Sequence, residues 1–317
     1  MTASPDPIAP TVVVLAAGLG ARYGGAKPFA PAGPDGEPLL AYALLDAHRA
    51  GAGDAVLVVR DADRERAEHL ADQLLARILP VQVVVQRHDD GITIAPERFA
   101  AAAAARTTPW GTGHAALAAW PHLSRAAVLL NGDDYYGTDA IAAAVDFARA
   151  LEGRRRNGQA LRPTAAAIGF PVAATTSARG GVNRALISQA VDGRVTSFDE
   201  VQDIRDDGIG NFSGTRDGAP ILLDADAVVS MNCWAMPHAG FALLANEFET
   251  FVAEGASGEF QLPSAITALV RRDAMRVMMR RTSGPWFGLT HPDDLDHVQA
   301  RLAALVDEEK YPSPLAP

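Results

Sequence analysis

The chain has 317 residues, of which 48% are hydrophobic and 21% charged, and its formal net charge is -10. This composition is typical of a globular protein with a sizeable core and excludes a largely disordered chain. The negative charge disfavours binding to nucleic acids or to anionic membranes, but a few local cations can still hold a small anion. The single cysteine, Cys233, excludes an internal disulfide and a thiolate metal cluster. With neither a basic, apolar leader nor an apolar run of membrane-spanning length, we expect a cytoplasmic protein.

The first 140 residues predict alternating strands and helices. The β-branched run 11–17 suits a strand buried on both faces, and 39–50 suits a helix that begins after Pro38 and stops at Gly51. Further strands are expected at 55–60, 81–86 and 126–130, further helices at 64–78 and 114–120, and a short helix or helical loop at 96–106. Such alternation predicts a parallel sheet.

The second half of the chain predicts a mixture of helices and antiparallel strands. We expect a helix to about residue 151, a basic turn at 154–156, strands near 164–170 and 185–190, a hairpin turn at Asp192-Gly193, a surface loop over 205–219 and a helix at 295–305. The predicted fold class is α/β, a Rossmann-like three-layer sandwich with a mainly parallel central sheet and a small antiparallel subregion that covers the substrate. We expect a single domain over 11–305, with halves at 11–140 and 141–305, and an irregular tail over 306–317.

The loop from Leu15 to Lys27 has the composition of an anion-binding loop. Its glycines allow the backbone to curve and leave amides exposed, while Arg22 and Lys27 are spaced to flank a polyphosphate. The prolines from Pro28 onwards disfavour a dinucleotide fingerprint and a Walker loop, because both of these open directly into a helix. A glycine-rich turn without a ligand is the remaining alternative.

Two carboxylates follow the buried strand at 126–130. Ligands of open parallel sheets bind at the carboxyl ends of the strands, so Asp133 is expected to project into such a crevice. Magnesium prefers hard oxygen ligands of this kind together with phosphate oxygens and water. The alternative is that Asp133 and Asp134 are turn residues after a strand, and for Asp134 the two interpretations are evenly balanced.

Several segments resemble a known family when taken together. Gly18-Leu-Gly-Ala-Arg22 followed by Lys27-Pro28 resembles the signature of the sugar-1-phosphate nucleotidyltransferase superfamily, which has a GT-A-like fold. Further segments are similar to one branch of nucleotidyltransferase-domain proteins, namely 109–115, 131–137, 182–184, 230–234 and 286–290. The resemblance spans residues 12 to about 297.

The resemblance implies a metal-dependent nucleotidyltransferase. The expected reaction transfers NMP from a nucleoside triphosphate to a sugar-1-phosphate, with Mg²⁺ as cofactor, release of pyrophosphate and formation of an NDP-sugar. The first half of the chain would bind the nucleotide and the second half the acceptor. The site residues expected are Arg22 and Lys27 as catalytic groups at the phosphates, Leu15, Ala16, Ala17, Gly18, Gly20, Gly111, Thr112 and Gly113 for the nucleotide, Asn183, Glu200 and Asn232 for the acceptor, and Asp133 for the metal.

One position departs from the pattern of the superfamily. A second metal ligand usually comes from a late Asp or Asn, but Thr290 occupies that position here. Asp293 and Asp294 lie just beyond it and are expected to favour the start of the helix at 295–305 instead. The departure leaves a non-catalytic nucleotide-sugar-binding protein as one alternative, and nucleotidyl transfer to a non-sugar phosphate as another.

Other polar and aromatic residues have both structural and functional interpretations. Glu200 and Asn232 could instead satisfy local backbone groups. His114 is expected to be structural, and Arg184 is a weaker candidate for contact with a phosphate or sugar. The aromatic residues Trp234, Trp286 and Phe287 are expected to form pocket walls or core.

Overall fold

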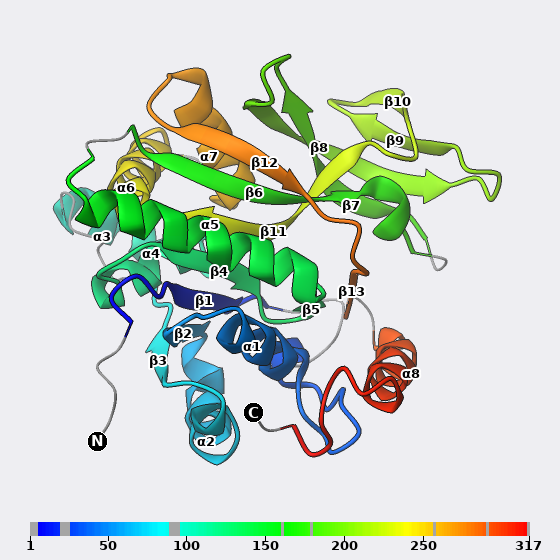
Figure 1. Ribbon diagram of the computed structural model, residues 1–317. Helices are drawn as coiled ribbons and strands as arrows, with labels where there is room; N and C mark the ends of the chain where they lie inside the picture. Colours follow the sequence, from blue (N-terminus) through cyan, green and yellow to red (C-terminus); the bar gives the residue numbers. More distant parts are fainter. Residues whose placement is uncertain are drawn as a thin grey trace.

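A computed structural model gives the fold of the chain (Figure 1). It describes residues 6–19, 26–88, 96–159, 162–177, 180–255, 258–289 and 292–315. Its strands are β1 (Thr11–Ala16), β2 (Asp54–Val59), β3 (Val81–Val85), β4 (Ala127–Asn131), β5 (Asp134–Tyr135), β6 (Thr164–Pro171), β7 (Val182–Gln189), β8 (Val195–Asp206), β9 (Phe212–Arg216), β10 (Ala219–Leu223), β11 (Val228–Met236), β12 (Arg276–Arg281) and β13 (Phe287–Gly288). Its α-helices are α1 (Leu39–Arg49), α2 (Arg64–Gln73), α3 (Pro96–Ala104), α4 (Thr112–Ala119), α5 (Thr138–Arg156), α6 (His238–Ala253), α7 (Leu262–Arg271) and α8 (Asp294–Asp307).

A large sheet forms the middle layer of the molecule. Its order is β10-β9-β8-β7-β11-β4-β1-β2-β3, and β6 joins β12 to β11. β1 pairs in parallel with β2 and β4, and β2 with β3, whereas β11 is antiparallel to β4, β6 and β7. The predicted parallel core therefore covers the first half of the chain, and antiparallel strands extend the sheet in the second half.

Helices cover both faces of this sheet. Val12 and Val14 of β1 face a core shared with α1, α5 and α8, whereas Val13 and Leu15 face a core shared with α4, α6 and α7. Because successive side chains of a strand point to opposite faces, the β-branched run of β1 is buried throughout. The predicted class, an α/β three-layer sandwich, is confirmed.

The predicted hairpin at Asp192-Gly193 is confirmed, but the surface loop predicted at 205–219 is wrong. Ala190 N donates to Arg194 O over 2.8 Å and closes the turn between β7 and β8. β8 continues to Asp206, and β9 and β10 then form a further hairpin around Asp217-Gly218. Asp207, Gly208, Gly210, Asp217 and Gly218 therefore lie in the turns between strands, whereas Gly214 lies inside β9.

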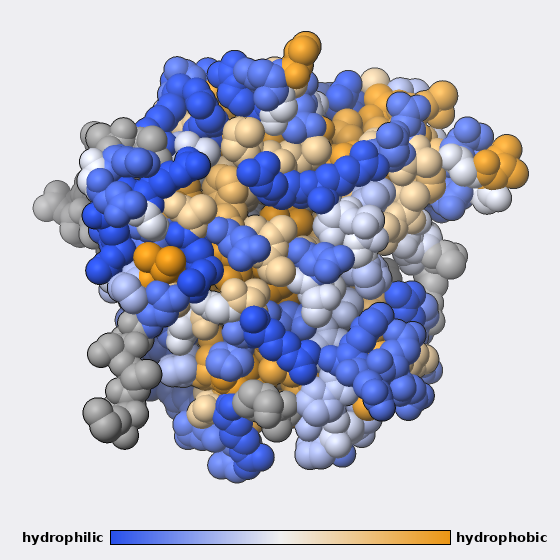
Figure 2. Space-filling view, viewed as in Figure 1, coloured by the Kyte–Doolittle hydropathy of each residue, from blue (hydrophilic) through white to orange (hydrophobic). Residues whose placement is uncertain are grey.

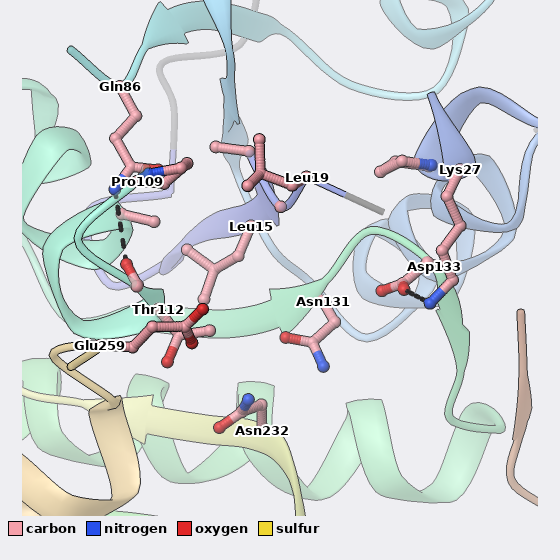
Figure 3. A pocket seen from close by; sticks show the side chains of 15 residues that line it. Leu15, Leu19, Lys27, Gln86, Pro109, Thr112, Asn131, Asp133, Asn232 and Glu259 are labelled. Atoms are coloured by element: carbon pink, nitrogen blue, oxygen red, sulfur yellow. Dashed lines mark hydrogen bonds and ion pairs between the residues drawn. The ribbon is translucent and has the colours of Figure 1, made fainter. Parts of the chain in front are cut away.

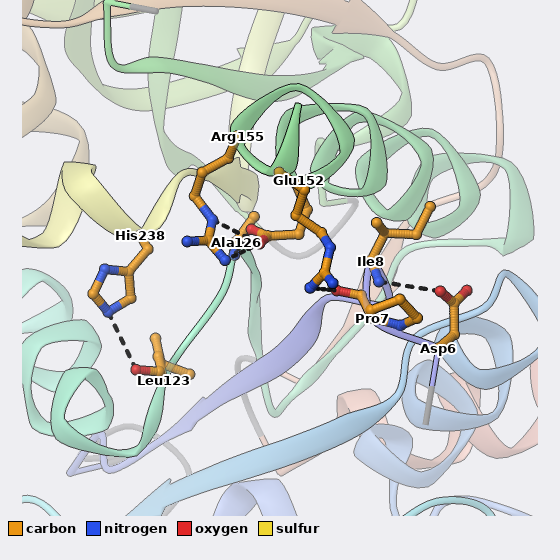
Figure 4. Close-up of polar contacts among 9 residues, drawn as sticks. Asp6, Pro7, Ile8, Leu123, Ala126, Glu152, Arg155 and His238 are labelled. Atoms are coloured by element: carbon orange, nitrogen blue, oxygen red, sulfur yellow. Dashed lines mark hydrogen bonds and ion pairs between the residues drawn. The ribbon is translucent and has the colours of Figure 1, made fainter. Parts of the chain in front are cut away.

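The basic turn predicted at 154–156 is also wrong, because α5 continues to Arg156. The positive side chains favour the negative end of the helix dipole in its last turn. Glu152, which is 1% exposed, forms an ion pair with Arg155 and accepts a hydrogen bond of 3.1 Å from Ala126 N. Figure 4 shows Glu152 between these two residues, so that its carboxylate joins α5 to the start of β4.

Two further helices have boundaries that differ from the predicted ones. The helix predicted at 64–78 ends at Gln73 and gives way to a 3-10 turn at Leu75–Arg77. α8 extends to Asp307, and the residues after it include no regular helix or strand up to residue 315.

None of the described helices is long and apolar enough to cross a membrane. Figure 2 shows apolar residues over β9 and β10, where Leu222 is 84% exposed.

The segment after α8 is nevertheless part of the core. Tyr311 and Leu315 are 2% and 1% exposed. Tyr311 Oη donates to Asp46 Oδ2 of α1 over 2.7 Å, and Leu315 N donates to Glu37 Oε1 over 2.9 Å. Burial raises the pKa of Asp46 to about 6, and the hydrogen bond from Tyr311 opposes that increase.

Candidate active site

The candidate site begins where β1 and β4 end side by side. Gly132 N donates to Leu15 O over 3.0 Å, just beyond the last pair of the two strands. A Cβ on Gly132 would lie 3.1 Å from Ala16 Cβ and 3.2 Å from Pro28 Cβ, so glycine lets the turn pack closely. The next residue, Asp133, forms an ion pair with Lys27. The two predicted phosphate and metal residues are thus in contact.

A cavity of about 320 Å³ opens at these strand ends (Figure 3). Its lining residues are Leu15, Ala17, Gly18, Leu19, Lys27, Pro28, Gln86, Pro109, Gly111, Thr112, Ala115, Asn131, Asp133, Asn232 and Glu259. Eight of the fifteen lining residues are glycine or apolar residues, whereas Lys27 and Asp133 lie together at one side. Such a cavity can hold a planar, largely apolar group with a charged end, as a nucleotide has.

The loop before α4 is fixed to the start of α7. Gly111, with φ of 106°, has a conformation that favours glycine. Gly113 N donates to Phe260 O over 2.9 Å, and Thr112 Oγ1 accepts a hydrogen bond of 3.0 Å from Leu262 N. The Gly113 amide is therefore already engaged, while the Thr112 hydroxyl proton remains available to a ligand.

Gln86 lines the far wall of the same cavity and contacts His114, which is fully buried. Gln86 Nε2 donates to His114 Nδ1 over 2.8 Å and lies 3.4 Å from Gly111 O. Burial lowers the pKa of His114 to about 3, so the ring is neutral and stacks on Phe99. His114 has the buried, hydrogen-bonded position expected of a structural histidine.

A second cavity, of about 280 Å³, adjoins the first. Both cavities are lined by Lys27, Thr112, Asn131, Asp133, Asn232 and Glu259. The further residues of the second are Asp134, Asn183, Arg184, Ala185, Glu200, Ser230, Met231, Gln261, Pro263 and Trp286. Unlike the first cavity, it is lined by several charged side chains from the antiparallel half of the sheet.

A bulge in β11 places Asn232 between the two cavities. The pairing of β11 with β6 shifts between Ser230 and Trp234, and Asn232 has a left-handed φ of 59°. Asparagine tolerates this conformation better than most residues. Asn232 Oδ1 lies 3.4 Å from Trp234 Nε1, which fixes the orientation of the amide.

Arg184 brings a partly buried positive charge to the second cavity. Its guanidinium donates to Thr175 O over 2.6 Å and lies 4.9 Å from the ring centroid of Trp286. Burial lowers the pKa of Arg184 to about 10, although Asp134 and Glu200 oppose this, so the side chain stays charged. Within the described part of the chain Arg184 forms no ion pair, and its Nε has no hydrogen-bond partner. A partly buried cation without a close counter-ion favours an anionic ligand.

Asp134 lies behind Asp133 and is held in place on several sides. It pairs with Gly288 across β5 and β13, and its carboxylate accepts a hydrogen bond of 2.9 Å from Asn131 Nδ2. Burial and the charge of Asp133 raise its pKa. Leu289 N donates to Asp133 O over 3.0 Å, so the segment after β13 is joined directly to the acidic turn.

The structure brings together most of the residues predicted for the site. Leu15, Ala17, Gly18, Gly111 and Thr112 line the first cavity, Asn183 and Glu200 line the second, and Lys27, Asp133, Asn232 and Thr112 line both. Ala16 lies inside the sheet, and Gly113 packs against Phe260 rather than on the cavity wall. Gly20, Arg22 and Thr290 lie outside the described residues.

Several lining residues were not predicted from the sequence. Gln86 directly follows β3, so the signal that identified Asp133, a polar residue at the end of a buried strand, would also have found it. Asn131 is the last residue of β4 and carries the same signal. Glu259 and Gln261 precede α7 in a segment without a motif, and only the contact between Phe260 and the 110–113 loop brings them to the site.

Comparisons with known proteins agree with this geometry. A family model described as the MobA-like NTP transferase domain matches residues 12–194. No curated protein matches the sequence. The fold is similar to that of the inositol-1-phosphate CTP transferase from T. maritima, with a TM-score of 0.58 and 16% identity over 93% of this chain and 96% of that one. It is also similar to a UDP-glucose pyrophosphorylase complexed with UDP-glucose, with a TM-score of 0.57 and 13% identity over 93% and 99% of the two chains. The chain therefore belongs to the MobA-like NTP transferase domain family and is a nucleotidyltransferase.

Proposed function

We propose that the protein transfers NMP from a nucleoside triphosphate to a sugar-1-phosphate. The observation that carries this proposal is the pair of adjoining cavities that share Lys27 and Asp133. The first cavity suits a base and ribose, the second suits a polar, anionic acceptor, and the shared wall lies where two phosphates would meet. The similarity to a UDP-glucose pyrophosphorylase supports the choice of a sugar phosphate.

The reaction needs charge neutralisation more than proton transfer. A phosphate oxygen of the acceptor attacks the α-phosphorus, a new P–O bond forms, and the bond to the β-phosphate breaks to release pyrophosphate. The attacking oxygen is already anionic, so no general base is required. Lys27 lies on the shared wall and would bind the phosphates of the nucleotide, while Arg184 would bind and orient the acceptor phosphate. Arg22 would add a second cation on the nucleotide side.

The acidic turn fits a divalent cation. Asp133 is 22% exposed at the shared wall, and its carboxylate contacts the single cation Lys27 among the described residues. One accessible carboxylate together with phosphate oxygens and water is a typical environment for Mg²⁺. Magnesium held by Asp133 would supply neutralisation of phosphate charge.

The hydroxylated part of the acceptor would lie against β8 and β11, two of the strands that line the second cavity. Glu200 of β8 and Asn232 of β11 offer a carboxylate and an amide to sugar hydroxyls. Asn183 Oδ1 already accepts a hydrogen bond of 3.0 Å from Asp203 N, so its NH₂ group is the part free to act as donor. We assign Gln86, which lines the first cavity alone, and Thr112, whose hydroxyl proton is available to a ligand, to the edge of the base.

The test is a pyrophosphate-release screen of each nucleoside triphosphate against a panel of sugar-1-phosphates with Mg²⁺. One nucleotide and acceptor pair is expected to give pyrophosphate and a product with the mass of the corresponding NDP-sugar. Tight nucleotide binding without pyrophosphate release across the panel would overturn the proposal and favour a non-catalytic nucleotide-sugar-binding protein.

A non-sugar acceptor is the second candidate, supported by the similarity to an inositol-1-phosphate CTP transferase. Its phosphate would bind the same Arg184, and its hydroxyls the same Glu200 and Asn232. Inositol-1-phosphate and other polyol phosphates therefore form a separate arm of the screen, in which product mass distinguishes the two candidates.

A further inference from the structure

Another cavity, of about 260 Å³, lies at the opposite edge of the sheet from the active site. It is lined by the starts of β8 and β12, the turn before β8, the end of α7 and Arg162 before β6. β6 and β12 are parallel to each other, and β6 is antiparallel to β11, which is antiparallel to β4. β6 and β12 therefore begin at the edge opposite to Asn131, the residue at which β4 ends (Figure 1).

This cavity is rich in arginine, although the protein as a whole is acidic. Four arginines line it, Arg162, Arg194, Arg271 and Arg276, together with one carboxylate, Asp273. Asp273 forms an ion pair with Arg162, and Arg194 and Arg276 also lower its pKa, so three guanidinium groups lie around one carboxylate. The net charge of the whole chain is -10, which makes such a concentration of positive charge unusual.

The arginines are only partly neutralised by their neighbours. Arg194 pairs with Asp192 over 2.6 Å, and Arg271 lies 3.8 Å from Asp199. Arg276 forms no ion pair with any described residue. Positive charge that is unpaired in the free protein remains available to an anionic ligand.

Beneath the arginines the cavity has an apolar floor. Val195, Met275 and Val277 are 3%, 2% and 0% exposed, and all three line the cavity. Guanidinium groups bind phosphate oxygens with two parallel hydrogen bonds, and the floor offers contact to an uncharged organic part. A cavity of this size accommodates a small molecule rather than a polymer.

From the arginine cluster and its apolar floor, we propose that this cavity binds a small phosphate monoester, separately from the active site. The phosphate contacts Arg194 and Arg276, and the organic part of the ligand lies over Val195 and Val277. The proposal does not depend on which substrates the active site takes, because the two sites lie at opposite edges of the sheet.

The test is equilibrium binding to the full chain, measured by isothermal titration calorimetry with inorganic phosphate and with glycerol 3-phosphate. The background variant Arg22→Ala/Lys27→Ala/Arg184→Ala removes the three cations proposed for the active site and is expected to retain one saturable site. In that background, Arg194→Ala/Arg276→Ala is expected to weaken binding by about 100-fold, about tenfold for each lost charge-assisted contact. Arg205→Ala, which removes an exposed arginine paired with Asp203, is the matched control and is expected to leave binding unchanged.

Two results would overturn the assignment. If the background variant binds neither probe, the anion site is the active site itself; if loss of Arg194 and Arg276 leaves affinity unchanged, the cluster is not the site. We expect glycerol 3-phosphate to bind more tightly than inorganic phosphate because its three-carbon chain adds contacts with the cavity wall, and equal affinities would contradict the choice of a monoester. Unfolding temperatures within a few degrees of wild type would exclude misfolding as the cause of lost binding. A site proved in this way would stand even if the pyrophosphate screen failed.

Discussion

The two cavities of the active site are built by different means. The first lies at the ends of the parallel strands β1, β3 and β4, and just over half of its lining residues are glycine or apolar residues. The second lies against β7, β8 and β11 and is walled by charged side chains such as Arg184 and Glu200. Glycines that line a cavity must occupy fixed positions in the sequence, whereas charged side chains can come from any strand that passes the site. The nucleotide side therefore leaves a motif in the sequence, and the acceptor side leaves scattered residues.

The largest effect is expected at the wall that both cavities share. Asp133→Asn and Lys27→Ala should each reduce turnover by about 100-fold or more, because each removes charge from the point where the phosphates meet. Pyrophosphate release measures the effect, with Lys310→Ala as a control on an exposed lysine paired with Glu308. Near-normal turnover in both variants would show that the shared wall is not the reacting centre.

The next effect separates the two cavities from each other. Arg184→Ala should raise the KM for the acceptor by at least about tenfold and leave the KM for the nucleotide nearly unchanged, because Arg184 lines the second cavity alone. Arg184→Lys should restore part of the lost affinity. If both KM values rise in parallel, the side chain supports the fold of the site rather than the acceptor.

A smaller effect is expected on the nucleotide side. A Cβ on Gly113 would lie 2.6 Å from Phe260 Cδ1 and 2.9 Å from Phe260 O, so Gly113→Ala must displace the loop that carries Thr112. We expect a severalfold increase in the KM for the nucleotide and a loss of about 1–2 kcal/mol in the free energy of unfolding. Gly153→Ala is the matched control, since Gly153 also lies in a helix and its Cβ would meet nothing within 4 Å. If Gly113→Ala and Gly153→Ala give the same KM for the nucleotide and the same free energy of unfolding, the loop is not tightly packed.

Asp46 lies outside both cavities, so a change there should have the smallest effect on turnover and should alter the free energy of unfolding instead. Its pKa is raised from 3.8 to about 6, so the folded state binds a proton more tightly than the unfolded state, and stability falls as the pH rises through that interval. The side chain of Asp46→Asn does not ionise, so the variant lacks this loss. The difference in free energy of unfolding between the variant and wild type should therefore shift by about 2 kcal/mol in favour of the variant from pH 4 to pH 7. Denaturant unfolding at the two pH values measures the gain, and Asp72→Asn, at an exposed position of α2, controls for the change in net charge. A constant difference at both pH values would contradict the raised pKa.

The parallel half of the fold could be predicted from sequence because its signals are local. The β-branched run at Thr11–Ala16 and the Asp192-Gly193 turn each specify their structure without distant contacts. The strands β9 and β10 were missed, because short strands between Asp- and Gly-rich turns have the same composition as a loop. The last turn of α5 was missed because its stability depends on the contact of Glu152 with Arg155 and Ala126.

The residues of the candidate site also differ in whether a local sequence pattern identifies them. Lys27 and Asp133 could be predicted, since each belongs to a segment with a recognisable order of residues. Glu259 could not, because it reaches the site through the hydrogen bond between Phe260 N and Trp110 O, which joins residues 150 positions apart. Arg184 was a weak candidate in the sequence, and its burial beside Trp286 is what makes it a strong one.

The contacts of Tyr311 and Leu315 bear on how the chain can be shortened in the laboratory. The sequence after α8 has the composition of a dispensable end, yet cutting it at Lys310 would remove the donors to Asp46 and Glu37 and expose the rings of Tyr42 and Tyr135, which now contact or bond Tyr311. An expression fragment that ends with the last helix would therefore lose part of its core. A fragment that retains residue 315 keeps that core intact.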